Sequence, residues 1–187
     1  MKFTEEKIAS LKAMNAKIQE TFSSLSADEM DLKPSEKSWS INECLDHLIQ
    51  TNSSYFNCFD AIAKGNYNAS AWSKLPLLPG FFGKMILGVV SPDAKKNTKT
   101  FKIWFPTKSK YGYNLASEMV ISNDALIEKI KALPEAELDR IITSPAGNFV
   151  NYSLRMALEI TTSHQIRHFN QAARVKQSLP LANLHPK

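Results

Sequence analysis

The chain has 187 residues, 43% of them hydrophobic, which suffices for one folded domain with a substantial core and excludes an intrinsically disordered protein. Its formal net charge of +5 is too mildly basic for a dedicated DNA-binding protein but suits an anionic small molecule. The N-terminus lacks the apolar segment of a signal peptide, and no apolar run is long enough to span a bilayer. We therefore expect a cytoplasmic protein.

The composition and the hydrophobic period predict an all-α fold, because the chain has only six glycines and its apolar residues recur mostly every 3.6 positions. The first helix is predicted to have Thr4 as its N-cap and acidic residues in its first turn. Its apolar face comprises Ile8, Leu11, Ile18, Phe22 and Leu25. Such a stripe is typical of a bundle helix. Residues 26–38, with Ser, Asp, Lys and a proline, are predicted to form a loop.

The clearest helix start follows this loop. Ser40 as N-cap and Glu43 three residues later form a capping box, and Trp39 is placed to pack on the first turn. The helix is predicted to run from Ile41 to Lys64. His47 lies close to its apolar face, where an ionisable group needs a partner. Taken alone, such a histidine is more often a hydrogen-bonded core residue than a metal ligand.

Both cysteines of the chain fall on this same predicted helix. Cys44 and Cys58 would lie about 21 Å apart along its axis, too far to form a disulfide, and a reducing compartment fits them best. Cys44 precedes His47 by three residues and could approach a metal bound there. We favour the alternative, in which Cys44 fills the core as a small buried residue.

The middle of the chain, residues 66–112, is the irregular part. An apolar stretch from Leu77 to Val90 predicts a short extra helix. From residue 91 to 113, lysines are interleaved with aromatic residues, a mixture that could bind single-stranded nucleic acid or a membrane surface. We favour a surface crossover whose aromatic side chains pack down while its lysines stay in solvent, and which forms a lid or pocket wall. Neither nucleic acid nor a membrane is therefore expected as a partner.

Two more long helices complete the predicted bundle. The first spans residues 116–132, and Ser153 caps the second, from Leu154 to Gln177. Between them, residues 139–142 could be extended. We expect a single domain over residues 1–178, with a loose tail at 179–187 in which His185 is a bystander.

The last helix carries His164 and His168, which share one face because they are four residues apart. Two imidazoles at this spacing can bind one metal ion. The same spacing occurs in zincin metalloproteases, but here Gln165 replaces the glutamate that acts as general base, which argues against a protease. Together with His47, the pair describes a three-histidine site with an open fourth position. Such a site is typical of catalysis, where the metal lowers the pKa of a bound water or thiol.

Two segments resemble those of a known family. KSWSINECLDHL at residues 37–48 and HQIRHFNQ at residues 164–171 match the DinB/YfiT-like superfamily in spacing, order and flanking residues. The resemblance extends to about Val175. It implies an up-down-down-up four-helix bundle, often a homodimer, with one divalent metal ion, Ni²⁺ or Zn²⁺, bound by His47, His164 and His168. It also implies either a hydrolase or a thiol transferase that uses a low-molecular-weight thiol.

Four further residues are candidates for supporting roles. Glu43, one turn before His47, either bonds the ring of that histidine or serves only the capping box, which we favour. Gln171 lies nearly in line with His164 and is a second candidate for contact with the ligands. Arg167 and Trp104 are candidates for binding the substrate.

The sequence thus favours a metal-dependent enzyme that acts on a small molecule, through a metal-activated water or a metal-bound thiolate. The alternative is a non-catalytic protein of the same fold that binds a small molecule or a metal. That alternative predicts a pocket closed by bulky side chains such as Trp72, Phe81 or Trp104.

Overall fold

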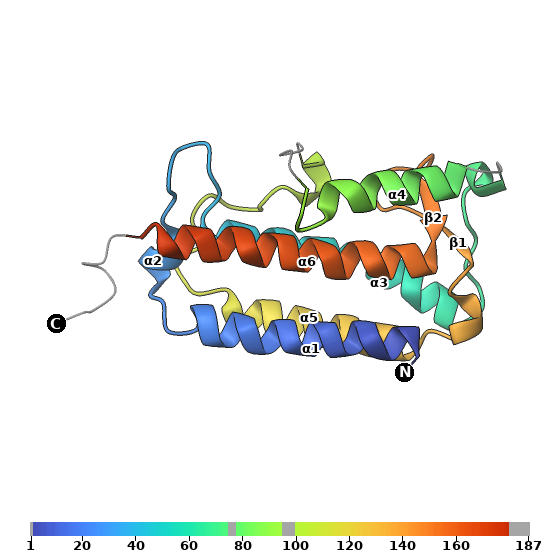
Figure 1. Ribbon diagram of the computed structural model, residues 1–187, viewed down its shortest axis with the longest axis horizontal. Coiled ribbons are helices and arrows are strands. Elements are labelled where there is room, and N and C mark those ends of the chain that lie inside the picture. The colour runs from blue at the N-terminus through green and yellow to red at the C-terminus, as the bar shows by residue number, and fades with distance from the viewer. Residues whose placement is uncertain (1, 75–77, 95–99, 180–187) are drawn as a thin grey trace.

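The computed structural model describes residues 2–74, 78–94 and 100–179 and contains six α-helices in these ranges (Figure 1). The helices are α1 (Phe3–Phe22), α2 (Ala27–Asp31), α3 (Ile41–Ala63), α4 (Leu78–Val90), α5 (Ala116–Lys131) and α6 (Leu154–Gln177). Two short strands, β1 (Ile141–Thr143) and β2 (Asn151–Ser153), pair antiparallel with Ile142 opposite Tyr152. None of the helices in the described ranges has the length and apolar character needed to cross a bilayer.

Four of these helices, α1, α3, α5 and α6, form a bundle (Figure 1). Helix α1 packs on α5 and α6, and α3 packs on the same two helices. Helices α1 and α6 run in one direction, whereas α3 and α5 both run in the other. The predicted up-down-down-up four-helix bundle is therefore confirmed.

Because α3 and α5 are parallel, the chain must return along the bundle between them. Helix α4 makes most of this return, lying outside the bundle against α6 and β2 (Figure 1). A Cβ atom at Gly83 would lie 2.7 Å from Met156 Cγ and 3.2 Å from Tyr152 Cβ, so glycine permits the close approach of α4. The predicted extra helix in the crossover is present, with nearly the expected bounds.

The helix starts follow the capping signals, with two corrections. Ser40 and Glu43 form the predicted capping box of α3, and Ser153 accepts a hydrogen bond from Met156 N–H at the start of α6. Thr4 is not an N-cap, because α1 already begins at Phe3. The predicted loop at residues 26–38 contains α2, whose capping box pairs Ser26 with Glu29.

The crossover and the tail differ from expectation in how their apolar side chains are placed. Three of the five aromatic side chains of the crossover, Phe101, Phe105 and Tyr113, are 44–55% exposed rather than packed down, whereas Trp104 and Tyr111 are partly buried. Side-chain carboxylates anchor the backbone of this segment instead: Asp46 accepts from the Thr107 N–H, and Asp31 from two later backbone N–H groups. Leu179 belongs to the core, whereas the remaining tail, residues 180–187, lies outside the described residues.

The core consists of two hydrophobic clusters separated by a layer of amide side chains. One cluster includes Leu11 and Leu126, and the other includes Ile18 and Met119. Between them lies what we call the amide layer, which takes one residue from each bundle helix: Asn15, Asn52, Asn123 and Gln165.

Asn123 is the centre of the amide layer. Its Oδ1 accepts hydrogen bonds from Asn52 Nδ2 at 2.9 Å and from Gln165 Nε2 at 2.6 Å, and its Nδ2 donates to Asn15 Oδ1 at 2.8 Å. Asn52 and Asn123 have no exposed surface. Any shift of one helix along its axis would break these bonds and leave buried polar groups unpaired, so the layer fixes the helix register.

We expect Asn123→Ala to lower the free energy of unfolding by about 2–4 kcal/mol, because several buried polar groups lose their partner at once. Urea denaturation followed by circular dichroism measures the loss. Ile121→Ala is the matched control, since this side chain on the same helix is 68% exposed, and should change stability by less than about 0.5 kcal/mol. A loss below about 1 kcal/mol for Asn123→Ala would show that the layer does not hold the helices together.

Candidate functional site

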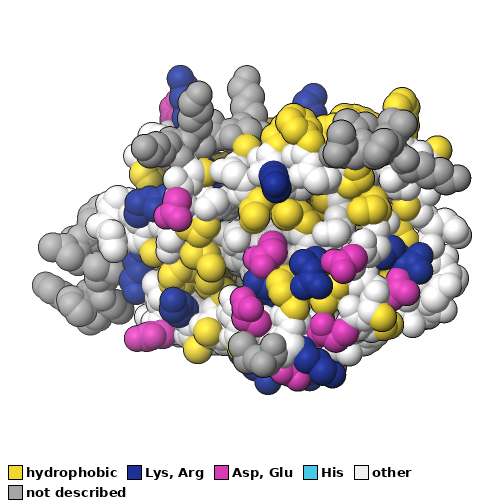
Figure 2. Space-filling model, turned by 45° about the vertical axis from the view of Figure 1, so that its right-hand side comes forward, with side chains coloured by type: hydrophobic (Ala, Val, Ile, Leu, Met, Phe, Trp, Pro, Cys, Tyr) yellow, Lys and Arg dark blue, Asp and Glu magenta, His cyan; other side chains and the backbone are white. Residues whose placement is uncertain are grey.

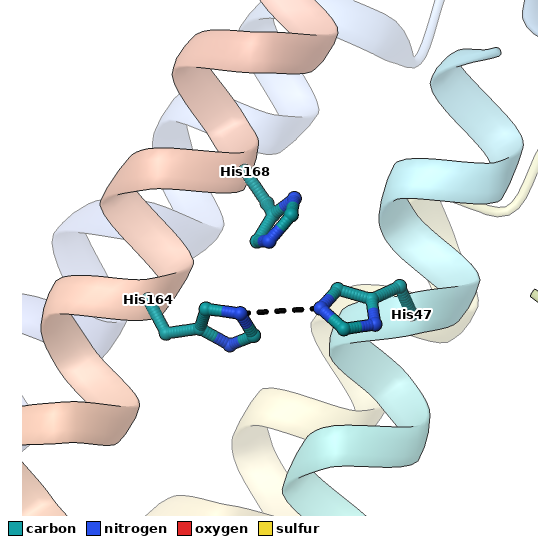
Figure 3. A group of neighbouring side chains, drawn as sticks. All are labelled: His47, His164 and His168. Carbon is teal, nitrogen blue, oxygen red and sulfur yellow. Dashed lines mark hydrogen bonds between the residues drawn. The ribbon is translucent and has the colours of Figure 1, made fainter. Parts of the chain in front are cut away.

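Three histidines from two helices converge beside the amide layer (Figure 3). His47 projects from α3, and His164 and His168 project from successive turns of α6. All three are at most 9% exposed, and a ligand atom from each lies within 4.8 Å of the other two. We call these residues the histidine cluster.

The ring of His47 is oriented by the backbone of the crossover. Its Nδ1 lies 2.6 Å from the carbonyl oxygen of Trp104. A carbonyl only accepts hydrogen bonds, so the proton of His47 is on Nδ1 and its Nε2 carries a lone pair. This Nε2 faces His164 Nε2 at 3.1 Å (Figure 3).

Neighbouring residues of α3 fasten the same crossover segment. Asp46 accepts hydrogen bonds from the Thr107 N–H at 2.6 Å and from its hydroxyl at 3.1 Å. Gln50 Nε2 donates to the carbonyl of Phe105 at 3.0 Å and to Asp46 at 2.8 Å. The position of the Trp104 carbonyl, and hence the orientation of His47, therefore depends on side chains within one helical turn of His47.

Burial makes the histidine cluster neutral at physiological pH. Desolvation lowers the pKa of His47 from its ordinary value of 6.5, although the Trp104 carbonyl opposes this shift. The pKa values of His164 and His168 lie well below 6.5, chiefly through desolvation and further through the other histidines and the Arg167 guanidinium. Neutral imidazole is the form that binds metal ions.

The donor set of the cluster fits a divalent metal ion. Two imidazole nitrogens bound tetrahedrally to Zn²⁺, each about 2.0–2.1 Å from it, lie roughly 3.3 Å apart, close to the 3.1 Å between His47 and His164. Nδ1 of His168 is buried and has no hydrogen-bond partner among the described residues, which is costly for a polar atom. The cluster could therefore hold a metal ion through three nitrogen ligands.

All three histidines line a cleft of about 1020 Å³ between α3, α6 and the crossover. Trp39 covers the cluster from one side: its ring stacks on His168 with centroids 5.8 Å apart and lies against His47 at 5.1 Å. The predicted role of the crossover as a pocket wall is thus met by Trp104 and Phe101, which line the cleft. Trp72 and Phe81 are 54% and 62% exposed and are not among its lining residues, so they do not close it.

The predicted supporting residues are placed as follows. Glu43 does not contact His47, since its carboxylate bonds Ser40 and pairs with Lys33 Nζ at 2.6 Å. Gln171 lines the cleft and lies near enough to His168 to influence its pKa. Arg167 also lines the cleft, and its guanidinium donates to the backbone carbonyls of Ser91 and Ala94 after α4.

Two other residues have structural rather than ligand positions. Cys44 is fully buried in the core, and burial, with the neighbouring Glu43 carboxylate, raises the pKa of its thiol far above the ordinary range. Gln165, at the position of the zincin glutamate, points into the amide layer. Neither of these two side chains is oriented to act at the cluster.

Sequence reasoning missed two contacts of the cluster. The carbonyl of Trp104 could not be identified, because a backbone acceptor carries no signature in the sequence. The contact of Trp39 with two histidine rings had a partial signal, an aromatic residue directly before the cap of the helix that carries His47.

We expect Asp46→Ala to weaken binding of Ni²⁺ or Zn²⁺ by roughly 10- to 100-fold, because a released Thr107 frees the carbonyl that orients His47. Calorimetric titration of metal-free protein measures this affinity. Asp60→Ala is the control: this aspartate is also on α3 but pairs with Lys129. Unchanged affinity together with faster amide exchange at Thr107 would show that the crossover does not hold His47.

Comparisons with known proteins place the chain in a family. A search of curated proteins finds no match. Among solved structures, YfiT from Bacillus subtilis, described as "a probable metal-dependent hydrolase with an unusual four-helix bundle topology", matches with a TM-score of 0.57. The match covers 93% of this chain and 86% of that chain at 14% identity, so it shows a shared fold. The model of the DinB superfamily matches residues 10–172, a range that includes the whole histidine cluster, and the chain belongs to this superfamily.

Proposed function

We propose that this protein is a metal-dependent enzyme that acts on a small molecule, with one Ni²⁺ or Zn²⁺ ion per chain held by His47, His164 and His168. The observation that carries this proposal is the convergence of three buried, neutral imidazoles on the wall of a cleft. A structural zinc site is normally closed by four protein ligands, whereas three ligands beside a cleft leave room for a substrate. The description of YfiT as a "probable metal-dependent hydrolase" supports the same proposal.

A divalent ion in such a site supplies Lewis acidity and an acidified water or thiol as nucleophile at neutral pH. The chain's own residues contribute orientation and shielding. The Trp104 carbonyl holds His47 in the tautomer that presents Nε2, and the Trp39 ring shields His168 and His47 from solvent. None of the described residues that line the cleft is acidic, which distinguishes the site from the glutamate-bearing site of zincins.

Trp104 and Arg167 are the proposed substrate-binding residues. The indole Nε1 of Trp104 is buried and has no hydrogen-bond partner among the described residues, and an acceptor oxygen of a bound substrate would satisfy it. Arg167 places a positive charge beside the cluster, where it favours an anionic substrate. We place Gln171 next to His168 as a residue that orients this ring.

Two reactions are compatible with this site: hydrolysis, and transfer of a low-molecular-weight thiol.

We also propose that the protein is a homodimer in the cytoplasm. Both cysteines are free thiols, as a reducing compartment requires. Apolar side chains gather over the surface where α4 lies (upper part of Figure 2), including Phe81 at 62% and Met85 at 47% exposure. Such a patch is typical of a protein interface.

The experiment that tests the function combines metal analysis with activity. We expect protein as purified to contain close to one Ni²⁺ or Zn²⁺ per chain, and His164→Ala to lose it. His185→Ala is the control, because it removes the one remaining histidine of the chain. Full metal content in His164→Ala would overturn the site. Hydrolysis of esters and amides, and conjugation in thiol–electrophile pairs, would separate the two reactions, and no metal-dependent turnover would leave the non-catalytic alternative.

We expect Trp104→Phe to raise KM about 2- to 10-fold without changing metal content, because it removes the indole N–H but keeps the backbone carbonyl that holds His47. Steady-state kinetics of the metal-loaded protein measure this effect. Trp72→Phe alters a tryptophan outside the cleft and should leave KM unchanged. If metal content falls along with substrate affinity in Trp104→Phe, the ring serves to position the crossover and not to bind substrate.

A further inference from the structure

The cleft extends along α6 beyond the histidine cluster, by about one turn towards the start of the helix and by more than two turns towards its end. Its lining residues on this helix run from Ile160 to Ser178, a distance of about 27 Å along the helix axis. The volume of about 1020 Å³ is at the upper end of the range for small-molecule sites. His164 and His168 lie between the two ends, so a long ligand would pass the cluster with a part on either side.

The end of the cleft towards the start of α6 is apolar. Its walls include Ile160, Ile86, Val90 and Val150. The hydroxyl groups of the two tyrosines here are already hydrogen-bonded within the protein. The Tyr55 and Tyr152 oxygens are 2.6 Å apart, and Tyr152 donates to Ser144 at 3.0 Å. We call this end the apolar arm, and its surface favours a hydrocarbon group over a polar one.

The end towards the C-terminus of α6 is cationic. Lys37 and Arg174 line it, and Arg167 lies beside the cluster. All charged residues among the described lining residues are positive. Neither Lys37 nor Arg174 forms an ion pair with a carboxylate of the described residues, so their charges are not neutralised within this part of the protein. We call this end the cationic arm, and it attracts an anionic group.

We propose that the cleft binds an elongated amphiphilic anion, in which an apolar acyl group is joined by an amide or ester bond to a part that bears a carboxylate. The acyl group occupies the apolar arm, the carboxylate occupies the cationic arm, and the acyl bond lies at the histidine cluster. This inference rests on the proposed function, of which it specifies the substrate class.

Hydrolysis of such a compound needs only water as co-reactant. The oxygen of water bonds to the carbonyl carbon, and the bond from that carbon to nitrogen or oxygen breaks. The protons of water pass to the leaving amine or, for an ester, to the leaving alkoxide and solvent. The products are an apolar carboxylate and a hydrophilic amine or alcohol that bears the second carboxylate.

The test uses N-acylglycines as probes of metal-free protein, with affinities measured by calorimetry. From N-acetylglycine to N-decanoylglycine, we expect Kd to fall roughly tenfold for every two methylene groups until the arm is filled. N-decanoylglycinamide, which lacks the carboxylate, should bind several-fold more weakly, and the difference should shrink at high salt. A Kd that is independent of acyl chain length would overturn the inference, and so would equal Kd values for N-decanoylglycine and N-decanoylglycinamide.

Variants assign each effect to its arm. Ile86→Trp should fill the apolar arm and weaken N-decanoylglycine at least tenfold while leaving N-acetylglycine unchanged. Lys37→Ala combined with Arg174→Ala should abolish the preference for the acid over the amide, and both side chains are exposed, so folding should be unaffected. Lys17→Ala, an exposed lysine on α1 outside the cleft, is the control. An unchanged preference in the double variant would contradict the cationic arm.

Failure of this inference is distinguishable from failure of the proposed function. If metal-loaded protein cleaves simple esters or amides with rates independent of chain length and charge, the function stands and the substrate class is wrong. If metal-free protein shows both binding preferences but metal-loaded protein releases no glycine from N-decanoylglycine, the ligand class stands and hydrolysis is wrong.

Discussion

The amide layer is the interaction on which the remainder of the structure depends. It joins one side chain from each of α1, α3, α5 and α6 in a core that is otherwise hydrophobic on both sides. Hydrophobic contacts tolerate sliding of helices, whereas buried amides do not, because each unpaired group costs about 1–3 kcal/mol. Gln165 directly follows His164, and Asn52 lies five residues after His47. The layer that sets the helix register therefore also sets the height at which the histidines of α3 and α6 meet.

The histidine cluster is assembled at a cost in stability that the surrounding contacts offset. Three imidazoles removed from water lose hydration, and the same desolvation lowers their pKa values so that they stay neutral. His47 is compensated by the Trp104 carbonyl, but Nδ1 of His168 has no partner among the described residues. A bundle selected for stability alone would fill this position with an apolar side chain. An unpaired polar atom on the wall of a cleft departs from the local rules of folding, as the proposed metal site would require.

The sequence contained enough information for the bundle and for the three histidines, but little for the contacts around them. Ser40 with Glu43, and Ser153, marked two helix starts through side-chain chemistry that is local in sequence. The four-residue spacing of His164 and His168 gave one face of α6, and His47 near the apolar face of α3 was a candidate third ligand that the family resemblance supported independently. Helix α2 was missed although Ser26 and Glu29 form the same kind of capping box. The sequence analysis considered Gln165 only as the residue that replaces the zincin glutamate. Its hydrogen bonds to Asn52 on α3 and Asn123 on α5 depend on tertiary packing, which no local sequence pattern encodes.

The directions of the helices explain why the crossover forms one wall of the cleft. Since α3 and α5 run parallel, a connection must carry the chain back along the bundle, and it can do so only on the outside, across α6 (Figure 1). This connection supplies Ile86 and Val90 to the apolar arm, and Trp104 to both the cleft and the His47 ring. The bundle thus positions the three histidines, while the crossover forms the wall of the cleft that faces them. Substitutions on the crossover that spare the Trp104 carbonyl can therefore change the shape of the cleft without disturbing the histidine cluster.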